Sequence, residues 1–136
     1  MRSLKYILII CLFTYNSLNA QSSEECLNNL SIFAESAKIK NYDVAYDTWL
    51  IVLNECPKLN LAIYTYGERI LKHKIKNTSS DEKERFKQDL ISLYDKWILN
   101  FPERKGISKI GSILSTKAQA LIDFKMADDI SVYKVF

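Results

Sequence analysis

Hydrophobic residues recur at helical spacing along almost all of the chain after residue 20, and strand-like alternation is hard to find. The clearest stripe runs from Phe86 to Phe101, where apolar residues return every three or four positions. Comparable stripes cover residues 27–37, 45–56, 63–74, 107–122 and 127–136. The pattern therefore predicts six helices, the fourth with Ser80 as its N-cap residue and acidic residues in its first turn.

Helix breakers divide these six segments into pairs. Pro57 and Pro102 each follow the second helix of a pair, and proline cannot continue a helix interior. The linkers within the pairs are short, which favours antiparallel neighbours in contact. The fold class predicted is all-α, with three stacked antiparallel hairpins over 26–57, 59–102 and 106–136.

The first twenty residues have the composition of a secretory signal peptide. Arg2 and Lys5 precede a short apolar run, and Ala20 is the small residue before the expected cut, which leaves Gln21 as the first mature residue. The apolar run is about half the roughly 20 residues that a membrane-spanning helix needs. We expect a cleaved signal over 1–20, a helical domain over 21–136 without a membrane span, and export to the periplasm or cell surface.

Composition excludes a polyanion as an obvious partner. The whole chain has a formal net charge of +3, but two of its 19 basic residues and none of its 16 acidic ones lie in the signal segment. The mature charge is therefore +1, and no nucleic-acid partner is expected. Nearly half of the residues are hydrophobic and only three are glycine, so disorder is not expected either.

Two cysteines lie at almost equal distances from the turn around Asn41. In an antiparallel hairpin this symmetry brings Cys26 and Cys56 side by side, and an exported protein meets oxidising conditions that permit a disulfide. The alternative is two free cysteines in a helical core, where cysteine is a common residue. The sequence favours the disulfide, provided that the two Cα atoms lie within about 7 Å.

The second helix of the first hairpin resembles the second half of a tetratricopeptide repeat. Seven residues carry the likeness. They are an amide and a Tyr-Asp pair at the turn (Asn41, Tyr42 and Asp43), a small residue at the helix crossing (Ala45), an aromatic residue one turn on (Trp49), a leucine (Leu53) and a closing proline (Pro57). A small side chain lets two helix axes approach while the aromatic fills the groove beside it. The resemblance implies stacked hairpins and a protein-binding or peptide-binding scaffold.

The remaining hairpins follow that repeat less closely. Gly67 and Gly111 suit the first helices of the second and third hairpins, but Leu90 replaces the expected alanine. Pro57 and Pro102 are 45 positions apart, against the 34 of the family. The likeness is thus to a degenerate array, and its cut site and repeats are similar to those of exported proteins of the Bacteroidota.

Aromatic residues suggest a second class of function. Tyr46 and Trp49 are echoed by Tyr94 and Trp97 at the same spacing, which is typical of core packing with the intervening aspartate outward. An envelope accessory protein that binds glycan would instead need tyrosines clustered on one open face. The residues that distinguish the two are Tyr42, Tyr46, Tyr64 and Tyr133.

The sequence shows few groups suited to catalysis. His73 is the only histidine and lies among lysines at a predicted helix end, without an evident nucleophile or further metal ligands. We therefore expect no enzyme activity, no cofactor and no metal. The apolar residues of 127–136 predict either missing downstream repeats or self-association at that end. The function predicted is non-catalytic binding of an unidentified protein or peptide in the cell envelope.

Overall fold

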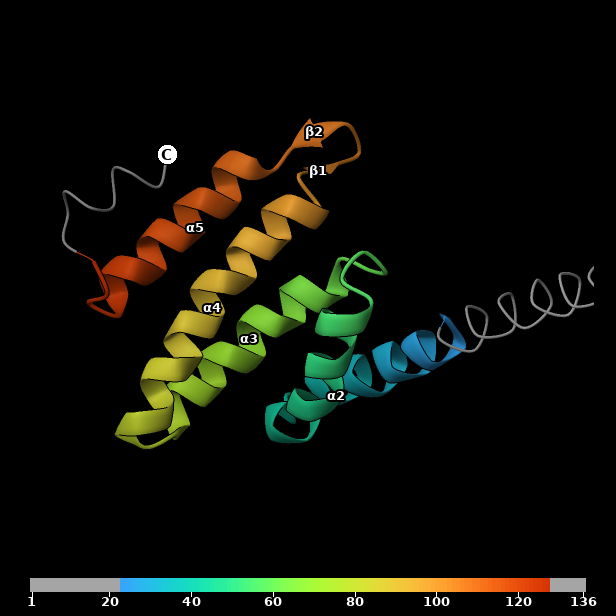
Figure 1. Ribbon diagram of the computed structural model, residues 1–136, viewed down its shortest axis with the longest axis horizontal. Helices are drawn as coiled ribbons and strands as arrows, with labels where there is room; N and C mark the ends of the chain where they lie inside the picture. The colour runs from blue at the N-terminus through green and yellow to red at the C-terminus, as the bar shows by residue number, and fades with distance from the viewer. Residues whose placement is uncertain (1–22, 128–136) are drawn as a thin grey trace, which may run out of the picture.

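The computed structural model describes residues 23–127, in which successive α-helices fold back on one another (Figure 1). The first helix covers residues 23–38, and the elements after it are α2 (Tyr42–Glu55), α3 (Ala62–Asn77), α4 (Ser80–Asn100), β1 (Glu103–Arg104), β2 (Ile107–Ser108) and α5 (Ile110–Asp123). The main contacts join α2 to α3, α3 to α4 and α4 to α5. The predicted all-α class, built from helices that pack in neighbouring pairs, is confirmed.

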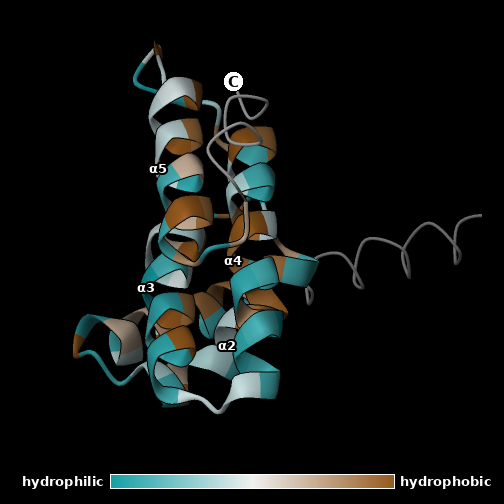
Figure 2. Cartoon of the chain, turned by 90° about the vertical axis from the view of Figure 1, so that its left-hand side faces the viewer, coloured by the Kyte–Doolittle hydropathy of each residue, from teal (hydrophilic) through white to brown (hydrophobic). Residues whose placement is uncertain are grey.

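One continuous core connects the helices. Its largest fully buried side chains come from the first helix and from α2, α3 and α4: Phe33, Trp49, Val52, Ile63, Tyr64, Ile70, Leu71, Leu90, Leu93 and Tyr94. Figure 2 shows hydrophobic and hydrophilic residues alternating around the helices, as the sequence pattern requires. Among the described residues, no polar or charged side chain is buried in this core.

Backbone hydrogen bonds define the turns between the helices. The first helix ends where Lys40 adopts a positive φ of 63°, and the amide of Asn41 bonds the carbonyl of Ser36. This is a Schellman arrangement, which satisfies carbonyls that the helix end leaves unpaired. Before α3, the side chain of Asn60 accepts a hydrogen bond from the amide of Ala62 at 2.8 Å, which stabilises the turn that leads into the helix.

The structure corrects four details of the sequence analysis. Ser79 and not Ser80 is the N-cap residue of α4, and no side-chain cap bond forms there. Ile107 lies in β2 and not in a helix, because a β-hairpin replaces the first predicted turn of α5. Leu27 is 51% exposed, since it follows Cys26 by one residue and the helix has turned it outward. Ile122, near the end of α5, is also exposed.

The predictions about the two ends of the chain fall almost entirely outside residues 23–127. The signal segment 1–20, its cut between Ala20 and Gln21, and all but the first position of the expected helix over 127–136 lie outside the described residues. None of the helices in residues 23–127 combines the length and the hydrophobicity that a membrane-spanning helix requires.

Candidate functional site

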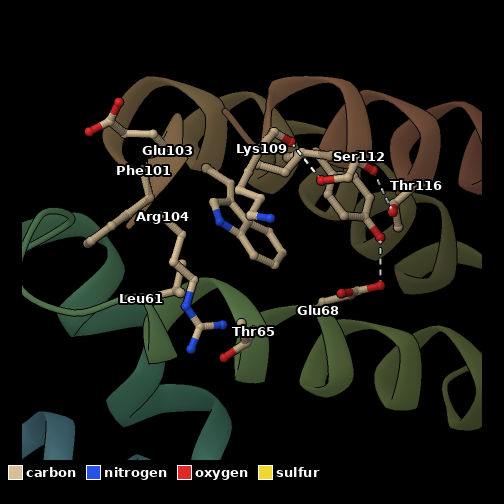
Figure 3. Close-up of a pocket in the computed structure, with 12 residues that line it drawn as sticks. Leu61, Thr65, Glu68, Phe101, Glu103, Arg104, Lys109, Ser112 and Thr116 are labelled. Carbon is tan, nitrogen blue, oxygen red and sulfur yellow. Dashed lines mark hydrogen bonds between the residues drawn. The ribbon is translucent and has the colours of Figure 1, made fainter. Parts of the chain in front are cut away.

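A groove of about 200 Å³ lies between α3 and α5, with α4 as its floor (Figure 3). Both outer helices pack on α4, so its side chains remain partly accessible between them. The lining residues come from the end of the loop before α3 and from α3, α4, β1 and α5 with its N-cap: Leu61, Thr65, Glu68, Tyr94, Trp97, Phe101, Glu103, Arg104, Lys109, Ser112, Ile113 and Thr116. A concave, largely apolar site with a few polar groups is the usual form of a binding pocket.

The aromatic floor of the groove is held in place by Tyr64 of α3. The ring of Tyr64 stacks on Trp97 with centroids 5.9 Å apart and meets Phe101 edge-on at 5.6 Å. Its hydroxyl donates to the carbonyl of Pro57 and accepts from the amide of Asn100, both at 2.9 Å. Trp97 and Phe101 are themselves half-buried. The floor is therefore a fixed apolar surface that a ligand side chain can contact.

One end of the groove is polar and internally paired. Glu68 accepts a hydrogen bond from the hydroxyl of Tyr94 at 3.0 Å and from the ammonium of Lys72 at 2.7 Å. Burial raises the pKa of Tyr94 well above its ordinary value, and the negative charge of Glu68 raises it further. The hydroxyl therefore remains a hydrogen-bond donor, and this end of the groove carries little uncompensated charge.

The opposite end carries two cations from the β-hairpin region. Arg104 extends from β1 towards Leu61 and Thr65, and the amine of Lys109 lies over the groove floor (Figure 3). Among residues 23–127, neither side chain has an ion-pair partner. Sequence reasoning missed this end of the site.

The loop between β1 and β2 has a sequence that is typical of a tight β-turn, so the hairpin could have been predicted. Lys105 and Gly106 form its two-residue loop, and both have positive φ, of 54° and 73°. A two-residue loop with two positive φ angles is the type I′ turn that joins antiparallel strands. Gly106 is one of only three glycines in the chain and follows Pro102 closely, so the segment has the composition of a turn.

A smaller cavity of about 150 Å³ lies between α2 and α4. Its lining includes Tyr46 and Trp49 from α2 and Asp89 and Lys96 from α4. Trp49 is almost fully buried, and the Tyr46 ring packs edge-on against Phe86 at 5.6 Å. This cavity therefore has less accessible aromatic surface than the groove over α4.

Two residues assigned separately to the repeat pattern meet in the structure. The ring of Trp49 in α2 lies directly against Gly67 in α3, where an added Cβ would be 2.7 Å from ring atoms. The indole N–H donates to the carbonyl of Ile63 at 2.7 Å. Ala45 is fully buried, as expected for a residue at a helix crossing. Gly111, by contrast, is exposed with open space where a Cβ would stand, so its predicted packing role has no counterpart among the described residues.

Of the other predicted motif residues, Leu53 lies in the core and the rest lie at its rim or on the surface. Leu53 is buried, Pro57 is half-buried and Pro102 is exposed. Asn41 is exposed before α2, and Tyr42 is half-buried against the ring of His73, with centroids 5.3 Å apart.

Asp43 connects two helices by its side chain. Lys74 donates to one carboxylate oxygen at 2.6 Å, and Nε2 of His73 lies 3.1 Å from the other. These contacts, with Lys74 the stronger, hold the pKa of Asp43 below its ordinary value. Asp95 forms a corresponding link to Lys117, so ion pairs join α2 to α3 and α4 to α5.

The two cysteines predicted to pair are brought together. Their Cα atoms are 6.3 Å apart, across a sequence separation of 30, and the structure places their sulfur atoms at bonding distance. Cys26 is buried and Cys56 is half-buried. The prediction that Cys26 and Cys56 are neighbours, made from their equal distances from the Asn41 turn, is therefore confirmed.

The tyrosines named for glycan binding do not gather on an open face among the described residues. Tyr64 is fully buried, and Tyr42 and Tyr46 are half-buried against other side chains. Tyr133 lies outside the described part. This distribution lends no support to glycan stacking. Over residues 23–127, no cluster of three or more potential metal ligands is present.

Comparisons with protein-family models, with curated protein sequences and with solved structures find no match to this chain. The functional interpretation therefore rests on the residues and their geometry.

Proposed function

We propose that this chain is an exported helical-repeat scaffold, similar to tetratricopeptide proteins, that binds a protein or peptide in the groove between α3 and α5 without catalysing a reaction. The observation that carries the proposal is the aromatic floor. Trp97 and Phe101 are half-buried, and the ring of Tyr64 in α3 packs against both of them. Preorganised aromatic surface contributes strongly to binding because little conformational freedom is lost on contact.

The helix packing supports a repeat-type scaffold. Trp49 approaches Gly67 closely between neighbouring hairpins, and the surface ion pairs from Asp43 and Asp95 connect successive helices in the same way. Stacked hairpins of this kind form concave binding surfaces. Repeats beyond residue 136, or a second copy at that end, would extend the surface.

Export to the periplasm or cell surface is part of the same proposal. It is supported by the signal-like pattern of residues 1–20 and by the proximity of Cys26 to Cys56. A disulfide between them would be retained in an oxidising compartment.

Site-specific photocrosslinking in the expressing cell tests the proposal. A photoreactive amino acid at Thr65 or Thr116 lies in the groove, and the same group at Asp47 or Ser115 lies on exposed helix surface outside it. We expect discrete protein adducts from the two groove positions, weakened by Trp97→Leu, and none of the same adducts from the control positions. Equal adducts at all four positions, or none in the groove, would contradict the proposal.

A further inference from the structure

We propose that the groove recognises an internal segment of a partner protein in which an acidic residue and a large apolar residue are two positions apart. The acidic side chain would contact Arg104 and Lys109, and the apolar one would lie on Trp97, one turn of α4 further from the hairpin end. This inference depends on the proposed function, because it specifies the partner of the same groove.

Charge complementarity identifies the acidic position. Arg104 and Lys109 both line the groove, and neither has an ion-pair partner within the described residues. Glu68, the carboxylate at the other end, is already bonded to Lys72 and Tyr94. The uncompensated charge of the groove is therefore positive and lies at the hairpin end. Arginine favours carboxylates because its fork of N–H donors matches the two carboxylate oxygens.

The dimensions of the groove set the spacing. On α3 its lining extends from Leu61 to Glu68, and on α5 from Lys109 to Thr116, which corresponds to roughly 10 Å at about 1.5 Å per residue. About three residues of an extended peptide cover that length at about 3.3 Å per residue. Alternate side chains of an extended chain point to the same side, so the first and third of these residues face the groove floor together.

A side-chain carboxylate fits this arrangement better than a chain terminus. The lining follows two outer helices for about two turns each, so a bound chain runs along the groove and presents side chains at both ends of it. Glu103 also lines the groove, but Figure 3 shows its carboxylate directed away from Arg104, and the two side chains form no ion pair.

Binding of synthetic peptides to the full protein tests the inference. The probe is a fluorescently labelled peptide, acetyl-Gly-Ser-Glu-Ser-Leu-Ser-Gly-amide, and its partner replaces glutamate by glutamine. Fluorescence anisotropy should show roughly tenfold or greater weakening for the glutamine peptide, because a charge-assisted contact is lost. The double variant Arg104→Gln, Lys109→Gln should bind both peptides equally and weakly. Lys76→Gln, an exposed cation at the far end of α3, is the matched control and should bind as the unaltered protein does.

The outcomes separate this inference from the proposed function. Equal affinity for the glutamate and glutamine peptides, no binding of either, or binding only to a version with a free carboxyl terminus would overturn the acidic-segment inference. If groove positions still crosslink to proteins in the cell, the proposed function survives that result. Loss of both the crosslinks and the peptide binding would remove the function as well. The comparison of the two peptides uses the unaltered protein, so it does not depend on whether a variant folds.

Discussion

The indole of Trp49 lies so close to Gly67 that no side chain fits between α2 and α3 at this point. A Cβ on residue 67 would approach ring atoms to 2.7 Å, and the same indole donates a hydrogen bond of 2.7 Å to the carbonyl of Ile63. The ring is thus held from two directions, by packing and by a directional bond. This contact fixes how the first hairpin meets the second.

Gly67→Ala should therefore destabilise the protein even though alanine is the better helix former. The Trp49 ring cannot move without straining its bond to Ile63, so we expect a loss of about 1–3 kcal/mol, typical of overpacking. Gly111→Ala is the matched control, because its Cβ would enter open space in α5. That variant should be neutral or more stable by up to ~1 kcal/mol. Urea unfolding followed by far-UV circular dichroism measures both, and similar effects from the two substitutions would show that the close contact is not limiting.

The two glycines also show what sequence reasoning could and could not predict. Helical periodicity records which side of a helix is buried, so the helices and most core positions followed from the stripe pattern, and the prolines marked the hairpin ends. Gly67 and Gly111 have the same place in that pattern. Only the structure distinguishes them, because close approach depends on what the neighbouring hairpin places opposite.

The groove was unpredictable for a related reason. It exists because α3 and α5, which are not consecutive, both pack on α4 and leave Trp97 and Phe101 accessible between them. Arg104 and Lys109 are positioned by a β-hairpin whose strands have two residues each. Such strands are too short to show an alternating pattern of hydrophobic and polar residues in the sequence. The cysteine pair was predictable because its two members are related by one local turn.

The cysteine pair should contribute substantially to stability. A bond that closes a loop with a separation of 30 residues restricts the unfolded chain by about 3–4 kcal/mol on the chain-entropy model. The double variant Cys26→Ala, Cys56→Ala should lose about that much in urea unfolding, and the unaltered protein in reductant should lose a similar amount. Mass spectrometry after alkylation provides the independent check. Two reactive thiols in the unreduced exported protein would show that the bond does not form.

Asp43 should give the protein a measurable acid sensitivity. Its contacts with Lys74 and His73 lower its pKa in the folded state below the ordinary value of 3.8, so the ionised form stabilises the fold above that value. This contribution disappears as the pH falls through the lowered pKa. The Asp43 side chain is 66% exposed, so solvent screening should limit the effect to less than about 1 kcal/mol.

Asp43→Asn should therefore reduce stability slightly at neutral pH and flatten the acid end of the stability profile. Asp47→Asn, one turn further along α2 on exposed surface, is the control. Thermal unfolding between pH 2 and 7, at low and high salt, measures the difference. An Asp43 variant with the acid profile of the unaltered protein would contradict the assigned role of the Lys74 contact.

Tyr94 should produce the opposite dependence at alkaline pH. Its hydroxyl is buried and donates to Glu68, which raises its pKa in the folded state above the ordinary 10.0. The stabilisation is complete below pH 10.0 and is lost as the pH rises above it, because the unfolded chain releases this proton first.

Tyr94→Phe should cost about 1 kcal/mol at neutral pH through the lost hydrogen bond, and the stability of this variant should fall less steeply above pH 10.0. Tyr66→Phe, on the same groove-forming helix as Glu68 but only half-buried, is the control. Urea midpoints across the alkaline range give the slopes, and identical slopes for the Tyr94 variant and the unaltered protein would mean that this hydroxyl titrates alike in the folded and unfolded states.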